Sequence, residues 1–150
     1  MSDSPADIRF TVPGSPRGKG RPRFGVVHGR AMAFMDKMTR SEEGAIRMFA
    51  SLAMSGKPPL EEAVELNLVA FVPIPASWSK KKQQEAEAGM IYPTGRPDLD
   101  NIKKLVCDAM NSVVFKDDSQ IVSAYSAKRY SRNPRITVRV RSSDPMDGML

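Results

Sequence analysis

The chain has 150 residues, which fits one domain over residues 1–150, and its single cysteine, Cys107, excludes an intrachain disulfide. No apolar run is long enough to cross a membrane and the first residues lack a secretory pattern, so we expect a cytoplasmic protein with no membrane partner. Because 23 lysines and arginines outnumber 17 aspartates and glutamates, giving a net charge of +6, the composition favours a polyanionic partner, most simply nucleic acid.

The first part of the chain is predicted to form a strand followed by a basic loop. Residues 8–12 alternate apolar and polar side chains, and Pro13 and Gly14 end the strand. The loop GSPRGKGRPRFG carries a basic residue at every second position, so an extended backbone would place these residues on one side. That arrangement suits contact with a phosphate backbone, and a solvated basic loop is the alternative. The candidate nucleic-acid-binding residues of this loop are Arg17, Lys19, Arg21 and Arg23.

Two short extended pieces are predicted within residues 26–34, around a turn at His28, the only histidine. With no second histidine or neighbouring cysteine, a zinc site at His28 is disfavoured. Ser41 is the predicted N-cap of the next helix, which ends before Gly56. The strict alternation over residues 64–72 then predicts a strand.

A polar segment, residues 77–94, joins this strand to the next helix and is expected to be an exposed loop. It is predicted to contain a short helix that ends at Gly89. Trp78 is interpreted as packing beneath the segment, with stacking on a nucleic-acid base as the less favoured role. Three consecutive lysines, Lys80, Lys81 and Lys82, are further candidates for contact with a DNA backbone.

The remaining chain is predicted to form a helix and two strands. The helix starts at Asp98 or Asp100 and runs to about residue 112. The strands, residues 121–128 and 136–140, are interpreted as a pair, and residues 142–150 are expected to form a flexible tail. The predicted order is strand, loop, helix, strand, loop, helix, strand, strand, which indicates an α+β domain with helices packed on a mixed sheet.

Three acidic residues at the ends of the last helix stand out in this basic chain. If the backbone around Asp98 and Asp100 is extended, both carboxylates point the same way, and a divalent cation would relieve their repulsion. Mg²⁺ prefers such oxygen ligands. Asp118 can join them only if the chain after the helix folds back to the helix start. Lys104 shares a helix face with Asp100, whereas Lys103 points about 100° away, toward solvent or a DNA backbone.

Ordinary structural roles account for the same residues. Asp98 fits an N-cap and Asp100 a first-turn acid that offsets the helix dipole. Asp117 and Asp118 fit a turn. The residue pattern alone therefore leaves both helix capping and a metal site open.

The motif R-P-D-L-D-N-x-x-K-x-x-x-D, followed by D-D-S-Q-I-V, resembles the RusA-like Holliday junction resolvases. The first strand and the GKGRPRF loop are similar to the N-terminal part of that family. The resemblance implies a Mg²⁺-dependent endodeoxyribonuclease, with Mn²⁺ as a substitute ion. It also implies a homodimer that cuts four-way DNA junctions in recombination and repair without a nucleotide cofactor. Carried onto this chain, the resemblance makes Asp98, Asp100 and Asp118 metal ligands, adds Lys104 to the catalytic set and gives Asp117 a secondary role.

Three other functions remain as alternatives. A general nuclease for flaps and branched DNA would cut a wider panel of substrates than four-way junctions. A non-catalytic basic DNA-binding module would bind DNA without needing a divalent ion. A protein-interaction domain would not bind a junction even at low salt.

Overall fold

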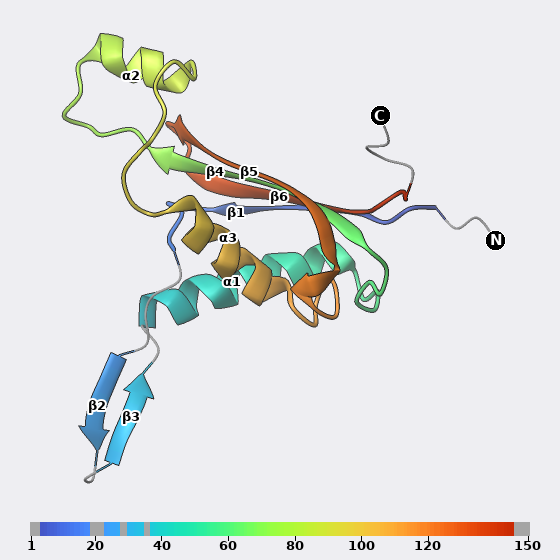
Figure 1. The fold of residues 1–150 in the computed structure, drawn as a ribbon. Helices are drawn as coiled ribbons and strands as arrows, with labels where there is room; N and C mark the ends of the chain where they lie inside the picture. The colour runs from blue at the N-terminus through green and yellow to red at the C-terminus, as the bar shows by residue number, and fades with distance from the viewer. Residues whose placement is uncertain (1–3, 19–22, 28–29, 35–36, 146–150) are drawn as a thin grey trace.

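The computed structural model describes residues 4–18, 23–27, 30–34 and 37–145, and only the backbone of residues 23–27, 30–34 and 37–41. A four-stranded mixed sheet carries two helices on one face, which confirms the predicted α+β class (Figure 1). In the described residues, no helix combines the length and the apolar character that a membrane crossing needs. The elements are β1 (Asp7–Pro13), β2 (Arg23–Val27), β3 (Arg30–Phe34), α1 (Lys37–Met54), β4 (Val64–Pro73), α2 (Lys80–Glu87), α3 (Leu99–Met110), the 3₁₀ helix η1 (Asp118–Gln120), β5 (Ile121–Ser131) and β6 (Arg135–Ser142).

The core lies between the sheet and the helices α1 and α3. Because side chains alternate across a strand, every second residue of β4 from Val64 to Val72 is buried, as its sequence predicts. α3 presents Ile102, Leu105 and Val106 to the same core at helical spacing. α1 adds buried residues of its own, and the two helices lie side by side on this face of the sheet (Figure 1).

The strand order is β1-β6-β4-β5, with β5 parallel to β4 and β6 antiparallel to both β4 and β1. The predicted pairing of the last two strands is therefore wrong, because β4 lies between them. β4 is the strand with the most regular apolar face, and a partner on each side satisfies the backbone groups of both its edges. Residues 132–134 carry the chain across the end of β4, where the carbonyl of Pro134 accepts a hydrogen bond from the Gly14 amide at 3.1 Å.

Two element boundaries in the first part of the chain also differ from expectation. α1 begins at Lys37, so Ser41 lies inside the helix and is not its N-cap. The preceding residues, Lys-Met-Thr-Arg, are compatible with helix, so nothing in them stops it from starting earlier. β2 begins at Arg23, inside the expected loop, and pairs with β3 as a hairpin. The predicted turn residue, His28, lies outside the described residues.

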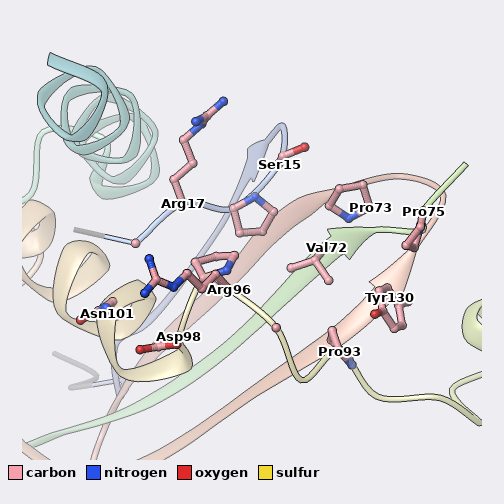
Figure 2. Close-up of a pocket in the computed structure, with 14 residues that line it drawn as sticks. Ser15, Arg17, Val72, Pro73, Pro75, Pro93, Arg96, Asp98, Asn101 and Tyr130 are labelled. Atoms are coloured by element: carbon pink, nitrogen blue, oxygen red, sulfur yellow. The ribbon is translucent and has the colours of Figure 1, made fainter. Parts of the chain in front are cut away.

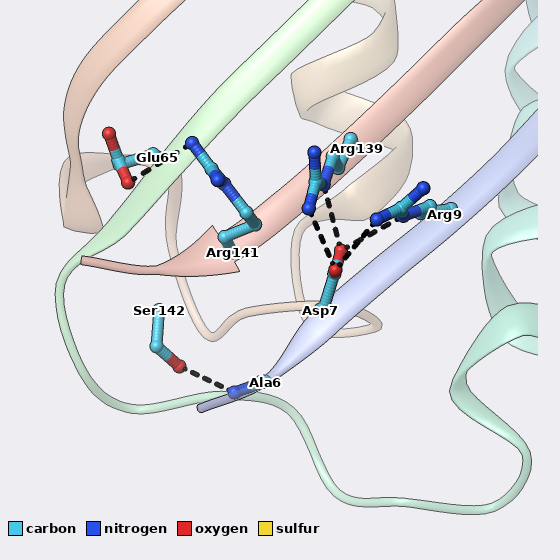
Figure 3. Close-up of polar contacts among 7 residues, drawn as sticks. All are labelled: Ala6, Asp7, Arg9, Glu65, Arg139, Arg141 and Ser142. Atoms are coloured by element: carbon cyan, nitrogen blue, oxygen red, sulfur yellow. Dashed lines mark hydrogen bonds and ion pairs between the residues drawn. The ribbon is translucent and has the colours of Figure 1, made fainter. Parts of the chain in front are cut away.

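The sheet face away from the helices carries charged residues, which Figure 3 shows near the start of β1. The carboxylate of Asp7 accepts hydrogen bonds from Arg139 at 2.9 and 3.0 Å and from Arg9 at 3.1 and 3.3 Å. Arg139 first, and Arg9 second, hold the pKa of Asp7 well below its usual range. At the same end, the Ser142 hydroxyl accepts a hydrogen bond from the Ala6 amide at 3.0 Å. The expected tail is thus anchored at its first residue, and residues 146–150 lie outside the described chain.

Candidate active site

Asp98 occupies the N-cap position of α3, with extended backbone angles of −67° and 142°. Its carboxylate nevertheless makes no capping hydrogen bond. The capping interpretation is therefore right about the position of Asp98 and wrong about the use of its side chain. The exposed carboxylate stands at the positive end of the helix dipole, where an anionic side chain is stabilised.

Asp100 lies in the first turn of α3, so the expected extended run from Asp98 to Asp100 does not form. Because a helix turns about 100° per residue, the side chain of Asp100 does not point the same way as that of Asp98, as it would on an extended backbone. Lys104 follows Asp100 by one turn on the exposed side of α3, as predicted from their spacing. Lys103 is half-buried, and its positive charge acts on Cys107, where it opposes the rise in the pKa of the thiol.

The chain after α3 docks near the end of that helix. Ser112 adopts a left-handed conformation, with φ of 66°, and ends the helical run. Leu60 then binds the turn that follows the helix. Its amide donates to the carbonyl oxygen of Val114 at 2.8 Å, and its own carbonyl accepts a hydrogen bond from the Lys116 amide at 3.2 Å. A helix of 12 residues covers about 18 Å, and this short turn does not reach back along it.

Asp118 consequently lies beside the second half of α3, near Cys107. Burial raises the pKa of the Cys107 thiol to about 11, and the negative charge of Asp118 adds to that rise. Cys107 comes two helical turns after Asp100, about 10 Å along the axis. Among the described residues, no three aspartate, glutamate, histidine or cysteine side chains gather closely enough to hold one metal ion. The closure that would bring Asp118 to the helix start is therefore absent within this chain, and its metal-binding role remains a prediction.

The motif around Asp118 has a clear structural part. Asp117 caps η1 by accepting a hydrogen bond from the Ser119 amide at 2.9 Å, and its own amide donates to the Gln120 side chain at 2.9 Å. The hydrogen bonds from Ser119 hold the pKa of Asp117 below its ordinary value. Gln120 also donates to the carbonyl oxygens of Leu60 and Glu62, each at 2.9 Å. The turn interpretation is therefore confirmed for Asp117, and the motif leaves Asp118 exposed.

A cleft of about 850 Å³ opens at the start of α3 (Figure 2). It lies where the parallel strands β4 and β5 end, beside the loop that follows β1. Ligands commonly bind at the carboxyl ends of parallel strands, next to a helix N-terminus. Its two ends differ, because polar residues gather around Asp98 and apolar residues line the opposite part. The polar residues are Arg17, Arg96, Asp98 and Asn101, and the apolar ones include Val72, Pro73, Pro75, Pro93 and Tyr130.

The basic loop reaches this cleft because a glycine lets it pack against α3. A Cβ atom at Gly18 would lie only 2.8 Å from the Cβ atom of Asn101. Arg17 lines the cleft and pairs with Glu42 of α1 at 3.8 Å. Among the other predicted loop contacts, Lys19 and Arg21 lie outside the described residues, and only the backbone of Arg23 is described, as the first residue of β2.

Lys128 anchors the segment that leads into Asp98 and was not identified from the sequence. Its ammonium group donates to the carbonyl oxygens of Gly95 at 2.7 Å and of Pro97 at 3.1 Å, in the segment that leads into Asp98. In register, Lys128 lies opposite Ala70, which is buried on the helix-covered face of the sheet. In the sequence, the feature that could have identified Lys128 was a lysine at a strand position on the helix-covered face of the sheet.

Arg96 and Asn101 were also missed, although both belong to the motif on which the family resemblance rests. Both side chains line the polar end of the cleft with Asp98 (Figure 2). Within the described part of the chain, no hydrogen bond or ion pair engages the Arg96 guanidinium. A charged donor left available in this position suits an anionic ligand.

The predicted lysine cluster forms the first turn of α2, outside the cleft lining. Trp78 packs edge-on against Tyr130, with ring centroids 5.2 Å apart, and the Lys82 ammonium lies 4.0 Å from the centre of the Trp78 ring. The packing interpretation of Trp78 is thus confirmed, and this contact holds α2 beside the apolar end of the cleft. Lys80 and Lys81 are exposed.

The start of α3 suits a divalent ion in chemical type. Mg²⁺ usually takes one or two protein carboxylates and completes its shell with water and substrate phosphate. Asp98 and Asp100 supply carboxylates of this kind at one end of the helix. Asp118 is not gathered with them in the single chain.

Comparisons with known proteins cover nearly the whole fold. The family model for endodeoxyribonuclease RusA matches residues 13–141, from the end of β1 into β6. An uncharacterized protein, YqaN of Bacillus subtilis (strain 168), is 37% identical over 139 residues, which cover 89% of this chain and 95% of YqaN. The family match includes the cleft, the start of α3 and the η1 turn.

Proposed function

Because the chain belongs to the RusA endodeoxyribonuclease family, we propose that it cuts branched DNA, four-way junctions in particular, by hydrolysing phosphodiester bonds. The supporting observation is the cleft, where Arg17 and Arg96 line the same end as the exposed carboxylate of Asp98 at the N-terminus of α3. The guanidinium groups and the helix N-terminus attract a DNA phosphate to this end. The net charge of +6 favours approach of the same polyanion.

We propose that the reaction needs a divalent ion, Mg²⁺ or Mn²⁺. Asp98 and Asp100 would hold it, and such an ion supplies an activated water and polarises the phosphate. Asp118 stays a predicted further ligand, although the single chain does not gather it with them. Arg96 binds the phosphate of the cut strand. Lys104, one turn after Asp100, offsets the negative charge that develops on the phosphate during hydrolysis. The loop arginines and the α2 lysines contact the DNA backbone outside the cleft.

The test is cutting of a synthetic four-way junction, with and without Mg²⁺, by the protein and its Asp100→Asn variant. We expect cutting only with the ion, and an Asp100→Asn variant that binds the junction but does not cut it. Cutting by this variant at the normal rate would remove Asp100 from the catalytic set. Cutting that persists in a chelator would overturn the need for a divalent ion.

A panel of junction, flap and plain duplex separates the substrate classes. Faster cutting of the junction than of the flap is expected, whereas equal rates would favour a general branched-DNA nuclease. Binding to all three substrates without cutting would favour the non-catalytic module. Mass measurement of the free protein in solution tests the homodimer that the family resemblance implies, and a monomer would contradict it.

A further inference from the structure

The apolar half of the cleft has no part in the phosphate chemistry proposed above. It is formed by Val72, Pro73 and Pro75 at the end of β4, by Pro93 in the segment before α3, and by Tyr130 at the end of β5. Val72 and Pro93 are buried, and the other three are half-buried or exposed. A phosphate and a metal ion would leave most of a cleft of about 850 Å³ unfilled. The apolar half therefore fits an apolar group that is attached to an anion bound at the polar end.

A nucleotide has this combination of parts, since a flat base with apolar faces is joined through its sugar to a phosphate. We propose that the apolar half of the cleft receives one unstacked nucleobase of the DNA strand, next to the phosphate that is cut. This inference rests on the proposed function, because it assigns a second group of the same substrate to the same cleft. Figure 2 shows the arrangement, with Arg17, Arg96 and Asp98 at one end and Pro93 and Tyr130 at the other.

Tyr130 is the aromatic surface of this subsite. Its edge-on contact with Trp78, at 5.2 Å and 70° between ring planes, holds the ring in place. Stacking of a base on an aromatic side chain partly offsets the loss of stacking within the DNA. That loss is smallest where bases are already poorly stacked, as at a branch point. The subsite would therefore favour branched DNA over plain duplex.

Prolines give the subsite little means of reading base identity. Three of its five residues, Pro73, Pro75 and Pro93, are prolines, and a proline carries no backbone N–H to donate to a base edge. The proline surface therefore offers shape and apolar contact, which all four bases can share. The Tyr130 hydroxyl is a side-chain donor within this half, and Arg17, Arg96 and Asn101 supply further side-chain donors at the polar end.

The direct test places 2-aminopurine, a base whose fluorescence rises on unstacking, on either side of the cut phosphate in a four-way junction. Binding of the intact protein in a chelator should raise the fluorescence about threefold or more at one of these positions. The same label in a duplex arm far from the branch should not respond. No rise at either position, in a protein that cuts this junction with Mg²⁺, would overturn the subsite and leave the proposed function standing. A protein that cuts neither junction nor flap with Mg²⁺ or Mn²⁺ would overturn both.

Two substitutions at Gly95, one small and one bulky, test whether the base binds in the cleft. Gly95 lines the cleft, and a Cβ atom there meets no atom within 4 Å, so Gly95→Ala should fold and should keep more of the fluorescence rise than a bulky substitution. Gly95→Phe should fill the cleft, remove the fluorescence rise and slow cutting by about tenfold or more. Junction affinity should change by less than about threefold, because phosphate contacts dominate binding. Normal cutting and a normal rise in Gly95→Phe would contradict the subsite.

Tyr130 supplies a second test that does not depend on Gly95→Phe folding normally. Tyr130→Phe keeps the ring and should keep the rise, whereas Tyr130→Ala should reduce it by about half or more. Thermal unfolding of each variant checks that the domain remains folded. Equal fluorescence changes in the two folded Tyr130 variants would overturn the role of the ring.

Discussion

Lys128 on β5 donates a hydrogen bond to the carbonyl oxygen of Pro97, the residue directly before Asp98, at 3.1 Å. A second bond from the same ammonium group reaches Gly95 at 2.7 Å. One strand residue thus fixes two carbonyl groups of the segment that leads into α3. The position of the Asp98 carboxylate depends on a residue that never needs to touch the DNA.

Replacing Lys128 by methionine should slow junction cutting by about ten- to hundredfold, since a small misplacement of a catalytic group has a large effect on rate. Loss of the two charge-assisted hydrogen bonds should also lower the free energy of unfolding by about 1–3 kcal/mol. Single-turnover cutting, junction binding and denaturant unfolding measure the three effects. Lys128→Arg, which keeps a cationic donor, should recover part of the rate. Weakened binding with an unchanged single-turnover rate would instead indicate direct contact between Lys128 and DNA.

Asp117 and Asp118 form a matched pair of neighbours with different expected roles. Asp117→Asn should cut and unfold almost normally, because asparagine is as good an N-cap as aspartate. Asp118→Asn should lose about a hundredfold or more in cutting rate if its carboxylate acts in the reaction. Parallel cutting assays at one Mg²⁺ concentration compare the two variants. Equal rates in both would remove Asp118 from the catalytic set.

Cys107 reports on the position of Asp118 without any cutting assay. Its pKa of about 11 means that its thiolate, the reactive form, is scarce at pH 8. Asp118→Asn removes a negative charge that raises this pKa, so alkylation of Cys107 by iodoacetamide should become faster at pH 8–10. Asp117→Asn is the control and should leave the rate nearly unchanged. Because Cys107 is buried, equal free energies of unfolding in the two variants must first show that access to the thiol is unchanged, and an unaltered rate in Asp118→Asn would then contradict its charge effect on Cys107.

The same pKa makes stability depend on alkaline pH. The folded-state pKa of Cys107 lies above its ordinary value of 9.0, so its contribution is present below pH 9 and is lost as the pH rises toward 11. Two pKa units correspond to a loss of about 2–3 kcal/mol over that range. Denaturant unfolding at pH 8 and pH 10.5 should reveal a smaller loss in Cys107→Ala than in the unaltered protein. The same loss in both would assign the alkaline instability to other groups.

Arg17 and Arg96 should carry part of the salt dependence of DNA binding. Arg17→Ala and Arg96→Ala should each weaken junction binding at all sequences and reduce the salt slope by about one. Lys57→Ala is a suitable control, because Lys57 is exposed after the far end of α1 and is absent from the cleft lining. Fluorescence anisotropy at several salt concentrations measures the slopes. A slope unchanged in Arg96→Ala would contradict its contact with phosphate.

Local patterns predicted the faces of the elements well and their neighbours poorly. The alternation in β4 and the helical spacing in α3 depend on burial of one side, which is a property of the segment itself. The pairing of β5 with β4 depends on the whole path of the chain, and alternation carries no information about which strand lies alongside. The predicted pairing of β5 with β6 failed for this reason.

The candidate site was likewise predictable where it depends on one segment and unpredictable where it depends on distant ones. The pattern left the start of α3 open between Asp98 and Asp100, whereas Asp100 and Lys104 on one exposed helix side followed from spacing alone. The position of Asp118 depended on Leu60, whose backbone hydrogen bonds to the turn after α3 keep that turn at the far end of the helix. Lys128 acts on a segment more than thirty residues earlier in the chain, so no local pattern includes both.

The strand order has a consequence for how the protein is made on the ribosome. In the described chain, β1 pairs only with β6, and β4 pairs only with β5 and β6, so each pair in the four-stranded sheet needs a strand that begins at Ile121 or later. A nascent chain that ends before Ile121 has its helices and its apolar β4 but no partner for either early strand. Such long-range pairing makes folding late and slow, and it leaves β4 exposed to aggregation until synthesis is nearly complete.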